Sequence, residues 1–321
     1  MKDTQFVYAV SRVRSGELKL LTLQELDQLL SMPDVKSAMR MLGDRGWDTE
    51  GESVEVMLRG ETEKTWSFIA EVCEDTSVFA LLLLKNDFHN LKAKIKATLT
   101  GGNAKDYYLA PVSVELETIE SAVNENNFEL LPEFMRTAAK EAFDVLLSVR
   151  DGQLADVVLD KAQLEAVREA GKKSGVPFVS QYAELVVALT DLKIAVRARK
   201  TGKSIDFLKR SLAECASLEI QELSLAAAQS QEALYEYIAH TPYGAALEAL
   251  NKSFSAFEKW CDDQIIAHIA DAKYRPFGIE PLFAYILARE NEIKMVRIVL
   301  SGIHNDLSKE SIRERLRNSY V

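Results

Sequence analysis

An apolar pattern recurs about every hundred residues in this chain of 321 residues. The tripeptide NLK at residues 90–92 is followed 101 residues later by DLK at 191–193, and after a further 101 residues by EIK at 292–294. Apolar residues keep this register on either side of each tripeptide. A fixed internal period indicates one structural unit used several times. The sequence therefore predicts three helical repeat units, at residues 1–110, 111–214 and 215–321.

The local sequence favours helices throughout. Glycine (14) and proline (7) are sparse, and residues 81–99 place their apolar side chains three and four positions apart, as one face of an α-helix requires. Few segments alternate with a period of two, so the predicted fold class is all-α. Thr22 is expected to form a capping box with Glu25, and Pro33 and Pro242 are expected in the first turns of helices.

Each repeated helix is followed by glycine in the sequence. The glycines stand at Gly101, Gly202 and Gly302, and each is expected to mark the end of its helix. The loops after them occur once per unit and should lie on one rim. Two interpretations remain open, because such loops either contact a partner or serve as plain connectors.

Composition excludes several classes of function. The net charge is −10 and the pI is about 5.1, which argues against nucleic-acid binding and against electrostatic anchoring on an anionic membrane. No apolar run is long enough to span a bilayer, and the start lacks the apolar core of a signal peptide, so a cytoplasmic protein is expected. The three cysteines, Cys73, Cys215 and Cys261, are far apart and are expected to be buried without disulfides.

Motifs that suggest catalysis or ligand binding fail on inspection. Residues 201–204 read TGKS, like the end of a phosphate-binding loop, but Arg197 stands where that motif needs glycine. The four histidines show neither metal-ligand nor triad spacing. The sequence therefore predicts no catalytic residue, no metal, no cofactor and no direct nucleotide binding.

The third repeat carries charges where the other two are apolar. Glu290 aligns with Phe88 and Leu189, and Arg297 aligns with Ile95 and Val196. If the stripe is buried, both charges need partners. The favoured interpretation is an internal salt-bridge network between helices, and the alternative is a face that meets another protein of a complex. The candidate structural or interface cluster comprises Lys85, Asn86, Asp87, His89, Asn90, Lys92, Arg289, Glu290, Asn291, Glu292, Lys294 and Arg297.

Several long segments resemble one family. They are YAVSRVRSGELKLL at 8–21, LLLLKNDFHNLKAKIK at 81–96, HTPYG at 240–244, PFGIEPLFAYILARENEIKMVRIVLSG at 276–302 and IRERLRNSYV at 312–321. Together they resemble the C subunit of the V/A-type ATPases, a family similar to the d subunit (AC39) of the eukaryotic vacuolar ATPase. The resemblance covers essentially the whole chain.

This resemblance implies an all-helical funnel of three similar subdomains around a pseudo-threefold axis. It also implies a non-catalytic rotor component that receives the D and F subunits of the central stalk and sits on the membrane proteolipid ring. Such a component is cytoplasmic and peripheral to the membrane through its complex. The alternative is a generic helical-repeat scaffold that binds soluble partners.

Overall fold

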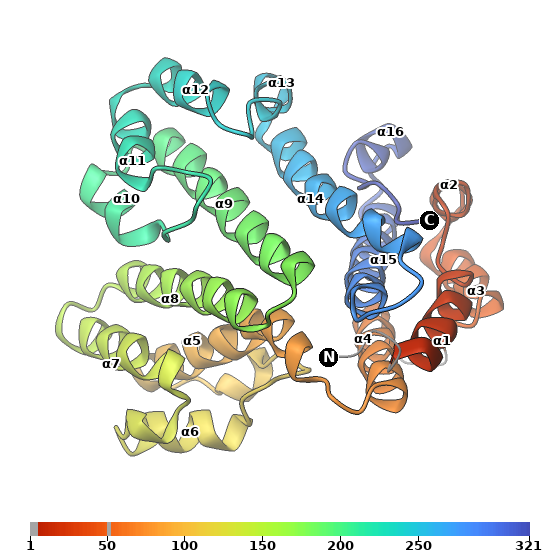
Figure 1. Ribbon diagram of the computed structural model, residues 1–321, viewed down its shortest axis with the longest axis horizontal. Helices are drawn as coiled ribbons and strands as arrows, with labels where there is room; N and C mark the ends of the chain where they lie inside the picture. Colours follow the sequence, from red (N-terminus) through yellow and green to blue (C-terminus); the bar gives the residue numbers. More distant parts are fainter. Residues whose placement is uncertain (1–5, 50–52) are drawn as a thin grey trace. The chain divides into compact units, whose positions relative to one another are not determined.

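Helices are the regular structure of the described part of the chain, residues 6–49 and 53–321, and no strand occurs there (Figure 1). The computed structural model confirms the predicted all-α class. The chain divides into two compact units: unit 1 contains residues 1–76 and 248–321, and unit 2 contains residues 77–247. Within the described ranges, every helix is too short or too polar to traverse a bilayer.

Unit 1 is built around α15, a helix of 25 residues. Its helices are α1 (Val7–Glu17), α2 (Leu23–Leu30), α3 (Val35–Asp44), α4 (Val54–Val72), α14 (Phe254–Ala270), η5 (Asp271–Tyr274), α15 (Glu280–His304) and α16 (Lys309–Arg313). Residues 281–288 of α15 are all buried, as expected of a helix enclosed on every side. It packs against α1, α2, α3, α4 and α14, so the two ends of the chain share one core.

Unit 2 is a layered stack of helices. These are η2 (Ser77–Leu82), α5 (Leu84–Thr100), η3 (Ala104–Tyr107), α6 (Leu116–Asn124), η4 (Phe128–Leu130), α7 (Glu133–Ser148), α8 (Gly152–Lys173), α9 (Pro177–Lys200), α10 (Ile205–Ser211), α11 (Ile220–Gln229) and α12 (Gln231–Ala239). Helix α8 packs against α5, α7 and α9 (Figure 1). Helix α13 (Ala246–Lys252) begins at the end of unit 2 and continues into unit 1.

Some predicted helix boundaries are confirmed and others are wrong. Thr22 and Glu25 form the expected capping box at the start of α2. Pro33 lies before Asp34, the residue that caps α3, and Pro242 lies in the turn before α13. Both prolines therefore belong to connections, where their fixed φ restricts the chain between two helices, and not to the first turn of a helix.

Two of the three repeated helices end at glycine as predicted. Gly101 and Gly202 adopt φ of 67° and 65°, the left-handed conformation that glycine allows at a helix end. The prediction for Gly302 is wrong, because this glycine lies inside α15 and is buried. Its missing side chain leaves room for Ile312, whose Cδ1 would lie 2.5 Å from an added Cβ. The left-handed residue after α15 is Asp306, with φ of 52°.

The second step of the repeat is 104 residues and not 101. Pro177 and Pro281 lie in the first turns of α9 and α15, and Ser204 and Ser308 cap the following helices α10 and α16. Both pairs are 104 residues apart. With this offset, every buried residue of α9 falls on a buried residue of α15. The 101-residue offset holds between α5 and α9, where all buried residues but Leu84 correspond.

Candidate functional site

The predicted cluster consists of two groups of side chains on two helices. Residues 85–92 lie on α5 in unit 2, and residues 289–297 lie on α15 in unit 1. The two groups therefore belong to different units of the chain.

A buried charge network surrounds Arg289 on α15. Its Nη2 lies 2.6 Å from Glu61 Oε2 of α4, and its Nη1 donates to Glu292. Its Nε lies 3.3 Å from Thr65 Oγ1, and the guanidinium stands 5.3 Å from the centre of the Trp47 ring. The side chains of Glu61 and Glu292 are only 5% and 3% exposed. A salt-bridge network between helices is therefore present, formed by residues other than the predicted pair.

The electrostatics of this network follow from burial. Loss of solvent raises the pKa of the Glu292 carboxyl, and the attraction of Arg289 counters only part of that rise. Burial also acts against the charge of Arg289, but the facing carboxylates, Glu292 first, outweigh it and raise the pKa of the guanidinium. Glu292 Oε1 also accepts the N–H of Leu21 at 2.5 Å. The network thus holds the connection between α1 and α2 against α15.

Glu290 and Arg297 do not lie on a fully buried stripe, so the condition under which both charges would need buried partners is not met. Glu290 is partly exposed, and the Arg297 side chain is 52% exposed and lies 3.0 Å from Glu55 at the surface. The offset of 104 residues aligns Arg297 with Lys193 and not with the buried Val196. A shift of three residues rotates a helix by nearly a full turn, so the two apolar stripes still overlap when the register is wrong.

The remaining polar residues of the α15 group hold the C-terminal segment and α14. Asn291 donates to the carbonyl of Asn318 at 2.9 Å. Lys294 and Arg317 both contact Asp262 Oδ2, at 2.5 and 2.9 Å. These contacts join α14, α15 and the residues after α16.

The α5 group holds the segment that returns along this helix. Asp87 is fully buried, and its Oδ1 accepts the backbone N–H groups of Ser113 and Val114 at 2.9 and 3.1 Å. Asn90, also fully buried, accepts the N–H of Leu109 at 2.8 Å and donates to its carbonyl at 2.9 Å. Backbone groups left without a helix or strand are thereby paired inside the unit, as burial requires.

The other residues of the α5 group lie nearer the surface. Asn86 Nδ2 donates to the carbonyl of Pro111 at 2.8 Å, and His89 Nε2 donates to that of Tyr107 at 3.0 Å. Lys92 pairs with Asp160 of α8 at 2.5 Å. Lys85 is exposed. The contacts of Asn86, Asp87, His89, Asn90 and Lys92 described above all lie within unit 2.

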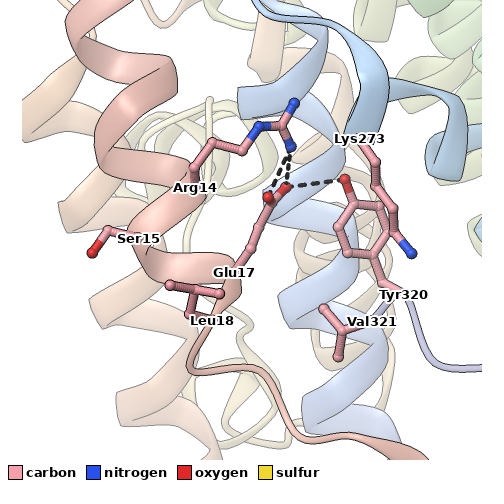
Figure 2. Close-up of a pocket in the computed structure, with 7 residues that line it drawn as sticks. All are labelled: Arg14, Ser15, Glu17, Leu18, Lys273, Tyr320 and Val321. Atoms are coloured by element: carbon pink, nitrogen blue, oxygen red, sulfur yellow. Dashed lines mark hydrogen bonds and ion pairs between the residues drawn. The ribbon is translucent and has the colours of Figure 1, made fainter.

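A surface hollow of about 660 Å³ lies beside α1 in unit 1 (Figure 2). Arg14 Nη1 lies 2.8 Å from both carboxylate oxygens of Glu17, and the Tyr320 hydroxyl donates to Glu17 Oε1 at 3.0 Å. Lys273 Nζ stands 4.7 Å from the centre of the Tyr320 ring. Burial raises the pKa of the Tyr320 hydroxyl. Arg14, Glu17 and Tyr320 are thus joined by the dashed contacts of Figure 2, which connect α1 to the C-terminal residues.

Sequence reasoning missed Glu61, Thr65 and Trp47. A signal for the first two was available, because Leu58, Glu61, Thr65 and Ile69 share one face of α4 and are all buried. A carboxylate on an apolar face predicts a buried partner. In the described ranges, no group of three or more His, Cys, Asp or Glu side chains is placed to hold a metal ion.

The polar side chains described above connect segments of this chain to one another. Comparison with known proteins assigns the chain to a family of rotary ATPase subunits. The sequence profile of the ATP synthase (C/AC39) subunit family matches residues 9–315. The chain therefore belongs to the family of the C subunit of the V/A-type ATP synthases, and the resemblance noted in the sequence is confirmed.

Relatives match over most of their lengths. The V-type sodium ATPase C subunit of Enterococcus hirae is 22% identical over 317 residues, which cover 96% of this chain and 97% of the relative. The A-type ATP synthase C subunit of Desulfurococcus sp. is 24% identical and covers 98% of this chain and 91% of the relative. The V-type ATP synthase C subunit of Thermus thermophilus is 23% identical over 74% of this chain and 73% of the relative.

Proposed function

We propose that this chain is a non-catalytic central-stalk component of a V/A-type rotary ATPase. In this role it is a socket that links the D and F subunits of the stalk to the membrane proteolipid ring and couples ATP hydrolysis or synthesis to ion transport. The observation that carries the proposal is the family match over residues 9–315. The matched relatives, named as C subunits of ATPases and ATP synthases, agree with it.

The internal construction suits a part that transmits force. A coupling component must resist deformation, and here polar side chains on α5 and α15 hold returning backbone segments against the helices. The charge network around Arg289 ties α4 to α15. Recurrence of the burial pattern in α5, α9 and α15 supports three similar helical subdomains. The protein is accordingly cytoplasmic and peripheral to the membrane through its complex.

Co-purification from gently solubilised membranes tests the proposal. A tag on this chain should recover the D and F subunits and a membrane proteolipid, in a complex that hydrolyses ATP. An untagged strain provides the control for non-specific recovery. Recovery of soluble partners alone, with no proteolipid in any detergent, would favour the generic helical scaffold instead.

The same preparation can be used to determine which ion the complex transports. The relatives include a sodium ATPase and several ATP synthases, so their names do not select one ion. Comparing ATP hydrolysis with and without Na⁺ at constant ionic strength assigns the coupling ion of the complex.

A further inference from the structure

A buried carboxyl group in unit 2 lacks the partners that an ionised carboxylate needs. Asp191 of α9 is 0% exposed. Its Oδ1 accepts the N–H of Ala213 at 3.1 Å, and its Oδ2 is buried without a hydrogen-bond partner. Burying an ionised carboxylate that is neither paired nor fully hydrogen-bonded is strongly unfavourable. The neutral carboxylic acid is therefore the less costly form of Asp191 at this position.

The groups around Asp191 do not compensate a negative charge. The titratable side chains that face it are Lys161 of α8, Glu184 of α9 and Cys215 of the following segment. Burial raises the pKa of Asp191 to about 8, and the Ala213 N–H and Lys161 lower it only in part, while Glu184 raises it further. From α10 and α11, which also pack against α9, no titratable group of the described chain contributes to this shift.

The side chains that align with Asp191 on the other two repeated helices are uncharged. The offset of 101 residues places Asn90 of α5 at this position, and the offset of 104 residues places Met295 of α15 there. All three side chains are buried. Asn90 holds its own returning segment through the amide. An uncharged side chain thus fills this position in the other two helices, and a protonated Asp191 satisfies the same requirement.

Asp191 contacts a short segment that has a second anchor. Residues 212–218 connect α10 to α11. Glu184 Oε1 accepts the N–H groups of Ala216 and Ser217 at 2.8 and 2.9 Å and the Ser217 hydroxyl at 2.8 Å. Cys215 lies between the two anchors and is half-buried. Burial raises the pKa of its thiol to about 11, so the thiol is protected from oxidation while the segment is closed.

We propose that residues 212–218 form a pH-sensitive latch, closed on α9 while Asp191 carries its proton and opened when that proton is lost to water. In the open segment the carboxylate is hydrated, and the Cys215 thiol becomes accessible. A group whose pKa is raised in the closed state stabilises that state fully below its ordinary pKa of about 4, and this stabilisation is lost as the pH rises towards about 8. The latch therefore weakens between these values and changes no further above them.

Hydrogen exchange of the intact protein tests the latch. Peptides covering residues 212–219 are followed by mass spectrometry between pH 5 and 7, with rates corrected for intrinsic exchange. In the wild type, the opening equilibrium is expected to rise about tenfold per pH unit, the slope for release of one proton. In Asp191→Asn, which keeps an acceptor for Ala213 and cannot ionise, the corrected opening equilibrium should be flat. Parallel profiles in the two proteins would overturn the proposal.

Two further variants serve as controls. One is a second non-ionisable replacement of Asp191, and the other removes a different buried carboxyl group. Asp191→Met copies the residue at the corresponding position of α15, and it should also give a flat profile, with more opening at every pH because the acceptor is lost. Asp87→Asn changes a buried carboxyl that already accepts three hydrogen bonds from Ser113 and Val114. It should leave the pH dependence of residues 212–219 unchanged. A pH slope that persists in Asp191→Met would also refute the latch.

Discussion

Arg289 holds two buried carboxylates, and its removal should be the most damaging change to a single charge in unit 1. Arg289→Ala leaves Glu61 and Glu292 without their common partner. Breaking a buried pair in this way costs about 3–5 kcal/mol of unfolding free energy. Tryptophan fluorescence during denaturant unfolding measures this loss within unit 1, because all three tryptophans, Trp47, Trp66 and Trp260, belong to that unit.

Arg297→Ala is the matched control on the same helix. Its partner Glu55 and the arginine itself are more than half exposed, and pairs of this kind contribute about 0–1 kcal/mol. Equal losses in the two variants would contradict the buried network.

The sequence identified the polar residues of this network only in part. Arg289 and Glu292 belonged to the predicted cluster, but the sequence singled out Glu290 and Arg297 as the charges that would need partners if the stripe were buried. The partner Glu61 is more than two hundred residues away in the chain. A single sequence carries no information on which distant carboxylate meets a buried arginine, so the contact had to come from the fold.

At the scale of helices, the crossing of α8 and α9 depends on one glycine. A Cβ at Gly171 would lie 2.4 Å from the Cβ of Ala183 on α9. Relief of this clash requires a shift of one of the two helix backbones. Gly171→Ala should therefore destabilise unit 2 by about 1–3 kcal/mol through overpacking. Circular dichroism during denaturant unfolding measures the change.

Gly60→Ala is the control, because the same substitution should stabilise the protein at this position. Gly60 lies inside α4, and no described atom would lie within 4 Å of an added Cβ. Alanine should stabilise the helix there by about 0.5–1 kcal/mol. A loss at Gly60, or a gain at Gly171, would show that the space around these glycines differs from the structure.

The end of α15 offers a separate test of the corrected repeat register. Asp306 takes the left-handed conformation that Gly202 takes after α9. Asp306→Gly should therefore stabilise unit 1 by up to about 1 kcal/mol, because glycine adopts this conformation without steric cost. Gly202→Ala should cost a similar amount in unit 2. The midpoint of thermal unfolding of each variant measures these changes. A loss of stability in Asp306→Gly would contradict the left-handed conformation of Asp306 at the end of α15.

The repeated helices show what periodicity can and cannot predict. The sequence located all three long helices, since an apolar stripe three to four residues apart survives low identity. It placed the third in the wrong register. A slip of three residues moves an apolar stripe by only about 60° around the helix, so the two stripes still overlap and the slip is not apparent from the sequence. Gly302 then appeared to be a helix end, although it is the position where α15 admits Ile312. Helix ends depend on packing of this kind, which a period does not record.

For the whole molecule, the repeat predicted similar units without showing which segments pack together. Helix α15 packs against α1–α4 from the start of the chain, and α5 packs against α6, α7 and α8, which follow it. The boundary predicted at residues 110 and 111 separates α5 from these partners. The division into residues 1–110, 111–214 and 215–321 is a statement about repetition in the sequence, and folding of isolated fragments decides whether it also describes independent structure.

We predict that residues 77–247 fold in isolation and that residues 111–214 do not. The longer fragment is one compact unit of continuous chain, and it keeps α5 with the contacts of Asp87 to Ser113 and Val114. The shorter fragment loses α5, so the apolar faces of α6, α7 and α8 that pack against it face water, and a core of this size cannot tolerate that loss. Circular dichroism and denaturant unfolding should show a cooperative transition for residues 77–247 and a broad one for residues 111–214. Cooperative unfolding of the shorter fragment would instead establish the predicted repeat as a folding unit, and α5 would then be an addition to a core that is already complete.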